Sequence, residues 1–142
     1  MSENFLFDAS SIILLVRELG EKAPDLLVTG STIPLAYYEA GNVVWKECFL
    51  HKRMSAEEAA KFLRSIFAVI QKMDMVRLEN EELGAAILDL AGSLNVTYYD
   101  ASYLLAAREH RRTLVTDDKG LISAAERMGI ETMESTTLTK SG

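Results

Sequence analysis

Short apolar runs alternate with longer helix-patterned segments along almost the whole chain. Five runs have the length and composition of buried strands, at residues 4–7, 26–29, 75–78, 113–116 and 130–133. The other segments carry helix-capping and helix-stopping residues at their ends, at residues 10–18, 32–51, 55–73, 80–94, 98–112 and 121–128. Strands that alternate with helices form a mainly parallel sheet joined by right-handed crossovers. The sequence therefore predicts an α/β domain.

The length of 142 residues fits one domain, and the 49% of hydrophobic residues can build a core without disulfides or a structural metal. We expect this domain to cover residues 1–134. The polar, non-periodic segment 135–142 predicts a flexible tail. Cys48 has no second cysteine to pair with, which fits a cytoplasmic protein. No segment resembles a signal peptide or a membrane span, so we expect no membrane association.

The formal net charge of −6 is unusual for a protein that only binds nucleic acid, because such proteins normally present a basic surface. It does not argue against a nuclease, since a cluster of catalytic carboxylates adds negative charge and bound cations reverse it locally.

Four carboxylates stand out by their positions. Asp8 and Asp118 each follow a predicted strand, Glu39 lies inside the helix at 32–51, and Asp100 lies in the first turn of the helix at 98–112. In parallel sheets ligands bind outside the carboxyl ends of the strands, where these residues are expected to meet. Asp8 and Asp100 can also stabilise helix N-termini, and Asp118 can be a turn residue, so these alternatives stay open.

Glu39 is the hardest of the four to explain as ordinary surface charge. Its helix is largely apolar, and no Lys or Arg lies three or four residues away. Asn42, three residues on, is expected to hold the carboxylate. Four converging carboxylates repel one another, and a hard divalent cation relieves that repulsion. We therefore predict one or two Mg²⁺ or Mn²⁺ ions, with Asp8, Glu39, Asp100 and Asp118 as ligands and catalytic residues.

Several further residues are candidates for supporting roles. The hydroxyls of Ser10 and Thr116 can serve the carboxylates or a substrate phosphate, and Asp117 can make an outer contact. Three cations are tentative RNA contacts, although they also complement helix C-termini: Lys46, Arg108 and Arg111. Four tyrosines can stack bases, although packing in the core or in a dimer is favoured for most of them: Tyr37, Tyr38, Tyr98 and Tyr99.

Four stretches taken together, at residues 6–10, 38–45, 99–107 and 114–121, resemble the motifs of the PIN-domain ribonucleases, most closely the VapC-type toxins. In the fourth stretch the Thr116-x-Asp118 pattern gives Asp118 the family position and Asp117 the variable one. The resemblance implies a three-layer α/β/α sandwich with a mainly parallel central sheet. It also implies a metal-dependent endoribonuclease that hydrolyses RNA, forms homodimers and is inhibited by a cognate antitoxin.

Three other functions remain open at this point. Some PIN domains act in RNA processing or decay without an antitoxin. A receiver-like or dehalogenase-like phosphate-handling domain would also place an aspartate after the first strand, but Asp8 has no companion acid at the next two positions. A binding module without catalysis has no use for four mutually repelling carboxylates.

Overall fold

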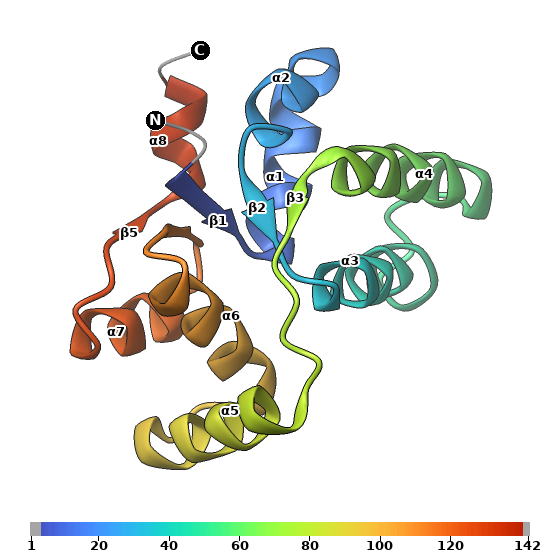
Figure 1. Ribbon diagram of the computed structural model, residues 1–142. Helices are drawn as coiled ribbons and strands as arrows, with labels where there is room; N and C mark the ends of the chain where they lie inside the picture. The colour runs from blue at the N-terminus through green and yellow to red at the C-terminus, as the bar shows by residue number, and fades with distance from the viewer. Residues whose placement is uncertain (1–3, 141–142) are drawn as a thin grey trace.

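The computed structural model describes residues 4–140, and its centre is a five-stranded parallel sheet in the order β3-β2-β1-β4-β5 (Figure 1). The strands are β1 (Phe5–Phe7), β2 (Ser31–Thr32), β3 (Asp74–Met75), β4 (Thr113–Val115) and β5 (Thr132–Met133). All four strand pairs are parallel. The predicted parallel sheet is confirmed.

Helices cover both faces of this sheet. They are α1 (Ala9–Leu19), α2 (Ala23–Leu27), α3 (Leu35–Trp45), α4 (Ala56–Lys72), α5 (Glu81–Leu94), α6 (Tyr98–Glu109), α7 (Lys119–Arg127) and α8 (Ser135–Lys140). A 3-10 turn, η2 (Gly20–Lys22), joins α1 to α2, and a π-helical turn, η3 (Lys46–Leu50), extends α3. One core lies under α1 to α4 and the other under α5 to α7. The predicted three-layer α/β/α sandwich is confirmed.

Successive side chains of the central strands point alternately into the two hydrophobic cores. Phe5 and Phe7 belong to the core on the side of α1, whereas Leu6 belongs to the core on the side of α6. On β4, Leu114 and Val115 are divided in the same way. Successive strand residues point to opposite faces, so a sheet covered on both sides favours apolar residues at successive buried positions. This explains why all three residues of β1, and Leu114 and Val115 of β4, are apolar.

The order of the strands fixes where a site can form. From β1 the chain passes through α1 and α2 to β2 on one side, while β4 pairs with β1 on the other side. Open parallel sheets bind ligands where the strand order reverses, at the carboxyl ends of the strands. Because Phe7 pairs with Val115, Asp8 and Thr116 leave the sheet side by side at this reversal.

Three helix ends predicted from sequence are as expected. Ser55 and Glu58 form a reciprocal capping box at the start of α4. Asn80 caps α5 by accepting a hydrogen bond from the Leu83 amide at 2.9 Å. Asn95 ends α5 in the left-handed conformation, at φ 56° and ψ 49°.

The prediction of a strand at residues 26–29 is wrong. These residues finish α2 and turn, and the strand is Ser31–Thr32, which sequence analysis placed at a helix cap. The strand is polar, yet fully buried, because the Ser31 hydroxyl donates to the Phe5 carbonyl at 3.0 Å and the Thr32 hydroxyl donates to the Phe7 carbonyl at 2.7 Å. Burying a hydroxyl is acceptable once it is hydrogen-bonded.

In the segment 135–142, for which sequence analysis predicted a flexible tail, residues 135–140 form α8, which contacts α1. Ser135 is fully buried, and its amide donates to the Asp117 carboxylate at 2.8 Å. Leu138 packs against the core on the α1 side. The domain therefore extends through α8, and residues 141 and 142 lie outside the described part of the chain.

Between residues 4 and 140, no helix combines the length and the apolar character needed to span a bilayer.

We predict that Gly30→Ala lowers the free energy of unfolding by about 1–3 kcal/mol, the usual effect of overpacking a core. A Cβ at residue 30 would collide with the ring of Phe7, which is fully buried. Gly92→Ala on α5 is the matched control, because its Cβ would meet nothing within 4 Å. That control should stabilise the helix by roughly 0.5–1 kcal/mol. Urea unfolding of both variants measures the difference, and equal stabilities would contradict the prediction.

Candidate active site

Asp8 lies at the junction of β1, α1 and β4, and its side chain is only 6% exposed. One carboxylate oxygen accepts a hydrogen bond from the Ser11 amide at 2.9 Å, which caps α1. The other oxygen accepts a hydrogen bond from the Thr116 hydroxyl at 2.5 Å. Thr116 in turn accepts a hydrogen bond from the Asp118 amide at 3.1 Å, so it links the two aspartates.

The side chain of Asp8 caps α1, which is one of the roles that sequence analysis left open for it, whereas Ser10, where the predicted helix began, is exposed. The buried Ser11 hydroxyl donates to the backbone carbonyls of Asp8 and Val115, at 2.9 and 3.0 Å. Ser11 therefore fastens α1 to β4, a role that sequence analysis missed.

Glu39 lies on α3, and its carboxylate is hydrogen-bonded to a residue of α6, on the other side of the sheet. The hydroxyl of Tyr103 on α6 donates to a Glu39 carboxylate oxygen at 2.7 Å. Tyr103 is 2% exposed, so this hydroxyl has little access to water. Asn42, the predicted partner, lines the same cavity but makes no hydrogen bond to Glu39. Tyr103 is thus a site residue that sequence analysis missed. Its only local signal is its position three residues after Asp100, on the same helix face.

Asp100 and Asp118 begin two further helices. Asp100 lies in the first turn of α6, where its amide donates to the capping Thr97 hydroxyl at 3.0 Å. Asp118 caps α7 by accepting a hydrogen bond from the Leu121 amide at 3.1 Å. The structure therefore brings carboxylates from four separate places in the sequence to one end of the sheet.

All four carboxylates line one cavity of about 440 Å³ at this end. Ser10 and Lys46, two of the predicted supporting and RNA-contacting residues, are also on its wall, together with Tyr38 and Tyr99. Asp8 and Asp118 meet in this cavity because the strands that precede them, β1 and β4, are neighbours in the sheet.

The carboxylates perturb one another. Burial is the largest cause that raises the pKa of Asp8, and the Asp117 charge adds to it, although hydrogen bonds from Thr116 and Ser11 act in the opposite direction. Burial likewise raises the pKa of Glu39, with further increases from the charges of Asp8 and Asp100, against the lowering effect of the Tyr103 hydroxyl.

Asp100 shows the same pattern. Burial raises its pKa most, and the negative charge of Asp118 raises it further. Raised acid pKa values mean that the site resists carrying its full negative charge, which is the condition that a bound cation would relieve.

The donor set fits a hard divalent cation. Carboxylate oxygens supply the four candidate ligands, and no Cys or His lines the cavity. Within residues 4–140, no three His, Cys, Asp or Glu side chains are close enough to enclose an ion by themselves. Mg²⁺ usually keeps several water ligands and binds through one or two carboxylates, so an open arrangement suits it.

Some predicted site residues lie elsewhere. Asp117 points away from the cavity, where its two oxygens accept hydrogen bonds from the amide and the hydroxyl of Ser135. Arg108 and Arg111 line a different cavity at the C-terminal end of α6, whereas Asp100 lies at its N-terminal end. The structure therefore does not bring these two arginines to the carboxylates.

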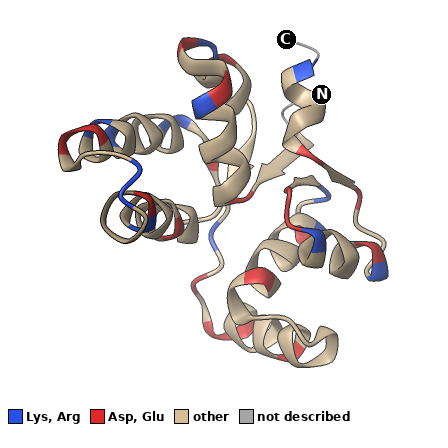
Figure 2. Cartoon of the chain, turned by 180° about the vertical axis from the view of Figure 1, so that it is seen from behind, with Lys and Arg blue, Asp and Glu red and all other residues tan. Residues whose placement is uncertain are grey.

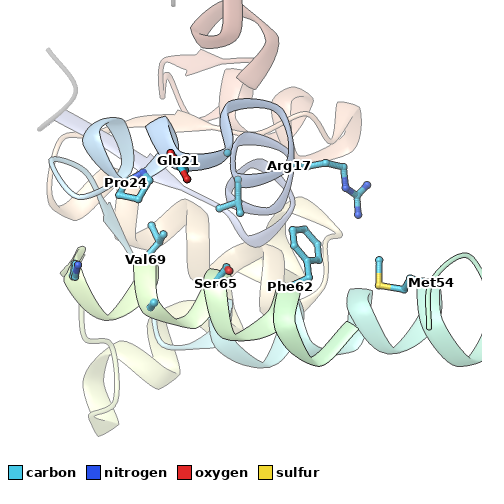
Figure 3. A pocket seen from close by; sticks show the side chains of 11 residues that line it. Arg17, Glu21, Pro24, Met54, Phe62, Ser65 and Val69 are labelled. Carbon is cyan, nitrogen blue, oxygen red and sulfur yellow. The ribbon is translucent and has the colours of Figure 1, made fainter. Parts of the chain in front are cut away.

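A larger cavity, of about 650 Å³, lies between α1 and α4, away from the carboxylates (Figure 3). Figure 3 shows Phe62 and Val69 from α4 facing Pro24 and Arg17 across this space. Glu21 is the only carboxylate on its wall. This cavity lacks converging acids, so the chemistry suggested by the carboxylates belongs to the smaller one.

No family model matches the chain. The chain is 29% identical to a Pyrobaculum aerophilum protein named Exonuclease VapC9. The match extends over 125 residues, which are 87% of this chain and 86% of that protein. The crystal structure of PAE2754 from Pyrobaculum aerophilum superposes with a TM-score of 0.79 at 25% identity, over 99% of this chain and 96% of that one. The predicted resemblance to VapC-type PIN domains is confirmed. A structure described as a toxin–antitoxin complex from Klebsiella pneumoniae has a similar fold, with a TM-score of 0.51 at 18% identity, over 83% of this chain and 89% of that one.

We predict that Glu39→Gln raises the melting temperature of the metal-free protein at neutral pH. The substitution removes a charge that burial and its neighbours disfavour, while the amide oxygen still accepts the Tyr103 hydrogen bond. After solvent screening the effect should be roughly 1 kcal/mol or less, which is a shift of a few degrees.

The pH dependence has a definite sign. The pKa of Glu39 is higher in the folded state than in the unfolded state, so the folded protein takes up the proton first as the pH falls. Wild type should therefore gain stability relative to Glu39→Gln as the pH falls through that raised pKa, and the difference should vanish below it. Thermal melts in EDTA over this range measure it. A variant that melts lower than wild type at every pH would contradict the repulsion.

Asp8→Asn is a poorer test of the same repulsion. Its carboxylate also caps α1 and accepts the Thr116 hydrogen bond, so the variant changes local structure as well as charge.

Proposed function

We propose that this VapC-type PIN domain is a ribonuclease that uses one or two Mg²⁺ or Mn²⁺ ions to hydrolyse RNA phosphodiester bonds. The observation that carries the proposal is the single cavity lined by Asp8, Glu39, Asp100 and Asp118 at the carboxyl end of a parallel sheet. The name of the Pyrobaculum relative, an exonuclease, supports nuclease chemistry.

The four carboxylates would hold the ions, and bound ions would lower the pKa of a water molecule and offset charge on the phosphate. The chain's own residues orient this chemistry. Thr116 fixes the relative positions of Asp8 and Asp118, and Tyr103 holds Glu39 where it can ligate an ion or orient the attacking water. Lys46 lies on the wall of the same cavity, which supports a contact between its ammonium group and a substrate phosphate.

Hydrolysis by water, without a covalent aspartyl intermediate, also fits the geometry of Asp8. Both oxygens of this carboxylate already accept hydrogen bonds from the chain, and the side chain is buried. A receiver-like or dehalogenase-like reaction would require one of these oxygens to attack phosphorus.

The biological role that we propose is the toxin of a toxin–antitoxin pair, acting in the cytoplasm as a homodimer. The Klebsiella structure, a toxin–antitoxin complex with the same fold, is consistent with such a role. An antitoxin that inserts Arg against the carboxylates would compete with metal, because a guanidinium pairs bidentately with a carboxylate. Co-purification from the native host tests this role, and an active enzyme that is always found alone would favour RNA processing without an antitoxin.

Internal cleavage is part of the proposal, whereas the Pyrobaculum relative is named an exonuclease. A covalently closed circular RNA separates the two activities, because it has no ends for an exonuclease to attack. We expect the protein to linearise it in Mn²⁺. Intact circles alongside degraded linear RNA would mean that the chain is an exonuclease.

Asp100→Asn should lower the rate of RNA cleavage by at least about 10²-fold, as expected when a key electrostatic contributor is lost. EDTA should abolish the wild-type activity. Asp89→Asn is the matched control, because Asp89 is an exposed carboxylate on α5 away from the cavity. Cleavage of a fluorogenic single-stranded RNA measures all three effects. Full activity in EDTA would overturn the metal mechanism.

Substitutions at the adjacent residues Asp117 and Asp118 should affect different properties, stability at the first and activity at the second. Asp118→Asn should lose most activity while keeping its stability, since Asn also caps helices. Asp117→Asn should keep most activity and melt lower, because an amide cannot accept both hydrogen bonds from Ser135. Cleavage rates and melting temperatures of both variants give the comparison. Similar losses of activity in two folded variants would show that the distinction is wrong.

A further inference from the structure

We propose that Tyr38 and Tyr99 stack the bases on the two sides of the scissile phosphate, which makes single-stranded RNA the substrate of this cavity. The inference rests on the proposed function, since it concerns the same site, but it assigns a binding role to residues outside the carboxylate set.

The two tyrosines have matching positions on two helices. Tyr38 immediately precedes Glu39 on α3, and Tyr99 immediately precedes Asp100 on α6. Neighbouring helix residues point about 100° apart, so an acid directed into the cavity leaves the preceding side chain at its rim. Both tyrosines do line the cavity. An aromatic face therefore adjoins two of the four carboxylates, on two different walls.

Both rings are largely in solvent, with 79% of Tyr38 and 59% of Tyr99 exposed. Within residues 4–140, neither makes a hydrogen bond or packs on another ring. The other tyrosines of the chain have partners: Tyr37 packs against Phe67, Tyr98 donates to the Gly84 carbonyl, and Tyr103 donates to Glu39. Sequence analysis favoured packing in the core or in a dimer for most tyrosines, and the exposure of Tyr38 and Tyr99 excludes the core for these two.

The cavity offers few cations to bind phosphates, so RNA affinity has to come from another kind of contact. Among the described residues, Lys46 is the only Lys or Arg on the cavity wall. Figure 2 shows the other Lys and Arg positions spread over several helices and loops. Neutralisation of phosphates by Lys and Arg, the usual source of nucleic-acid affinity, is therefore small here. Stacking of a base on an aromatic side chain supplies about 1–3 kcal/mol per base without any cation.

Stacking also selects the form of the substrate. Bases in a duplex are already stacked and paired, whereas single-stranded bases are free to pack on protein rings. Trp45 extends the same helix face, since it lies seven residues after Tyr38 and is 49% exposed. The aromatic row thus leads away from the carboxylates along α3, as a path for a single strand.

A binding measurement tests the proposal without relying on cleavage. A short fluorescein-labelled single-stranded RNA is titrated with protein in Ca²⁺, and a gel of the product checks that the RNA is intact. Tyr38→Leu and Tyr99→Leu should each weaken binding by roughly 10- to 100-fold, because leucine is apolar but has no flat ring. Tyr38→Phe and Tyr99→Phe, which keep the ring, should restore it. Leu88→Gln removes an exposed apolar side chain on α5 and is the control.

A second titration uses RNA that carries abasic residues beside the scissile phosphate. Wild type should bind this RNA as weakly as the double variant Tyr38→Leu/Tyr99→Leu binds intact RNA, and the double variant should lose nothing further on the abasic RNA. Leucine variants that bind intact RNA like wild type would overturn the proposal. So would leucine variants that keep RNA binding but lose self-association in light scattering, because the rings would then belong to a protein interface.

The same measurements distinguish a failure of the proposed nuclease function from a failure of the stacking proposal. Tyrosine-dependent binding of an RNA that is never cleaved in Mg²⁺ or Mn²⁺ would support the stacking role and refute the nuclease. A wild-type protein that binds no single-stranded RNA would overturn both.

Discussion

The carboxylate of Asp8 is a buried anion at the point where β1 ends, α1 begins and β4 passes alongside. Desolvation makes its charge unfavourable, and the chain compensates with hydrogen bonds from the Ser11 amide and the Thr116 hydroxyl. Those hydrogen bonds fix where α1 starts and how β4 lies beside β1. Asp8, one of the proposed metal ligands, is therefore also a structural element, so a loss of activity at Asp8 has to be separated from a loss of fold.

The remaining carboxylates surround Asp8 from three other helices, and their charges act on one another. No three of the acidic side chains within residues 4–140 form a closed cage. An open arrangement leaves coordination positions for water and for phosphate oxygens, which a catalytic ion needs and a structural ion does not. Burial is the largest cause of the raised pKa values of Glu39 and Asp100, and the charges of the neighbouring carboxylates raise them further.

Sequence analysis succeeded where the determining interactions are local and failed where they are distant. The caps at Ser55, Asn80 and Asn95 depend on residues within one helical turn. The four carboxylates, which line one cavity in the structure, were selected from their positions relative to predicted strands and helices. The two-residue strand Ser31–Thr32 was missed because its hydroxyls bond to carbonyls of β1, 25 or 26 residues away. Tyr103 was missed because its partner Glu39 is 64 residues distant. Arg108 and Arg111 were chosen by charge alone, and charge carries no information about which end of α6 they occupy.

An acidic cavity with a single lysine places a requirement on any RNA that enters it. Like charges keep a polyanion away until something else offsets the phosphate charge, and Lys46 can offset one contact. In the proposed reaction that offset falls to the bound ions, so metal occupancy controls substrate binding as well as chemistry. The same dependence makes the site easy to block, because a partner that presents one guanidinium to the carboxylates displaces metal and removes the attraction for RNA together. Net negative charge is thus compatible with the proposed nuclease function: in that proposal the carboxylates supply metal affinity, the ions supply phosphate affinity, and uncharged aromatic faces supply contact with the bases.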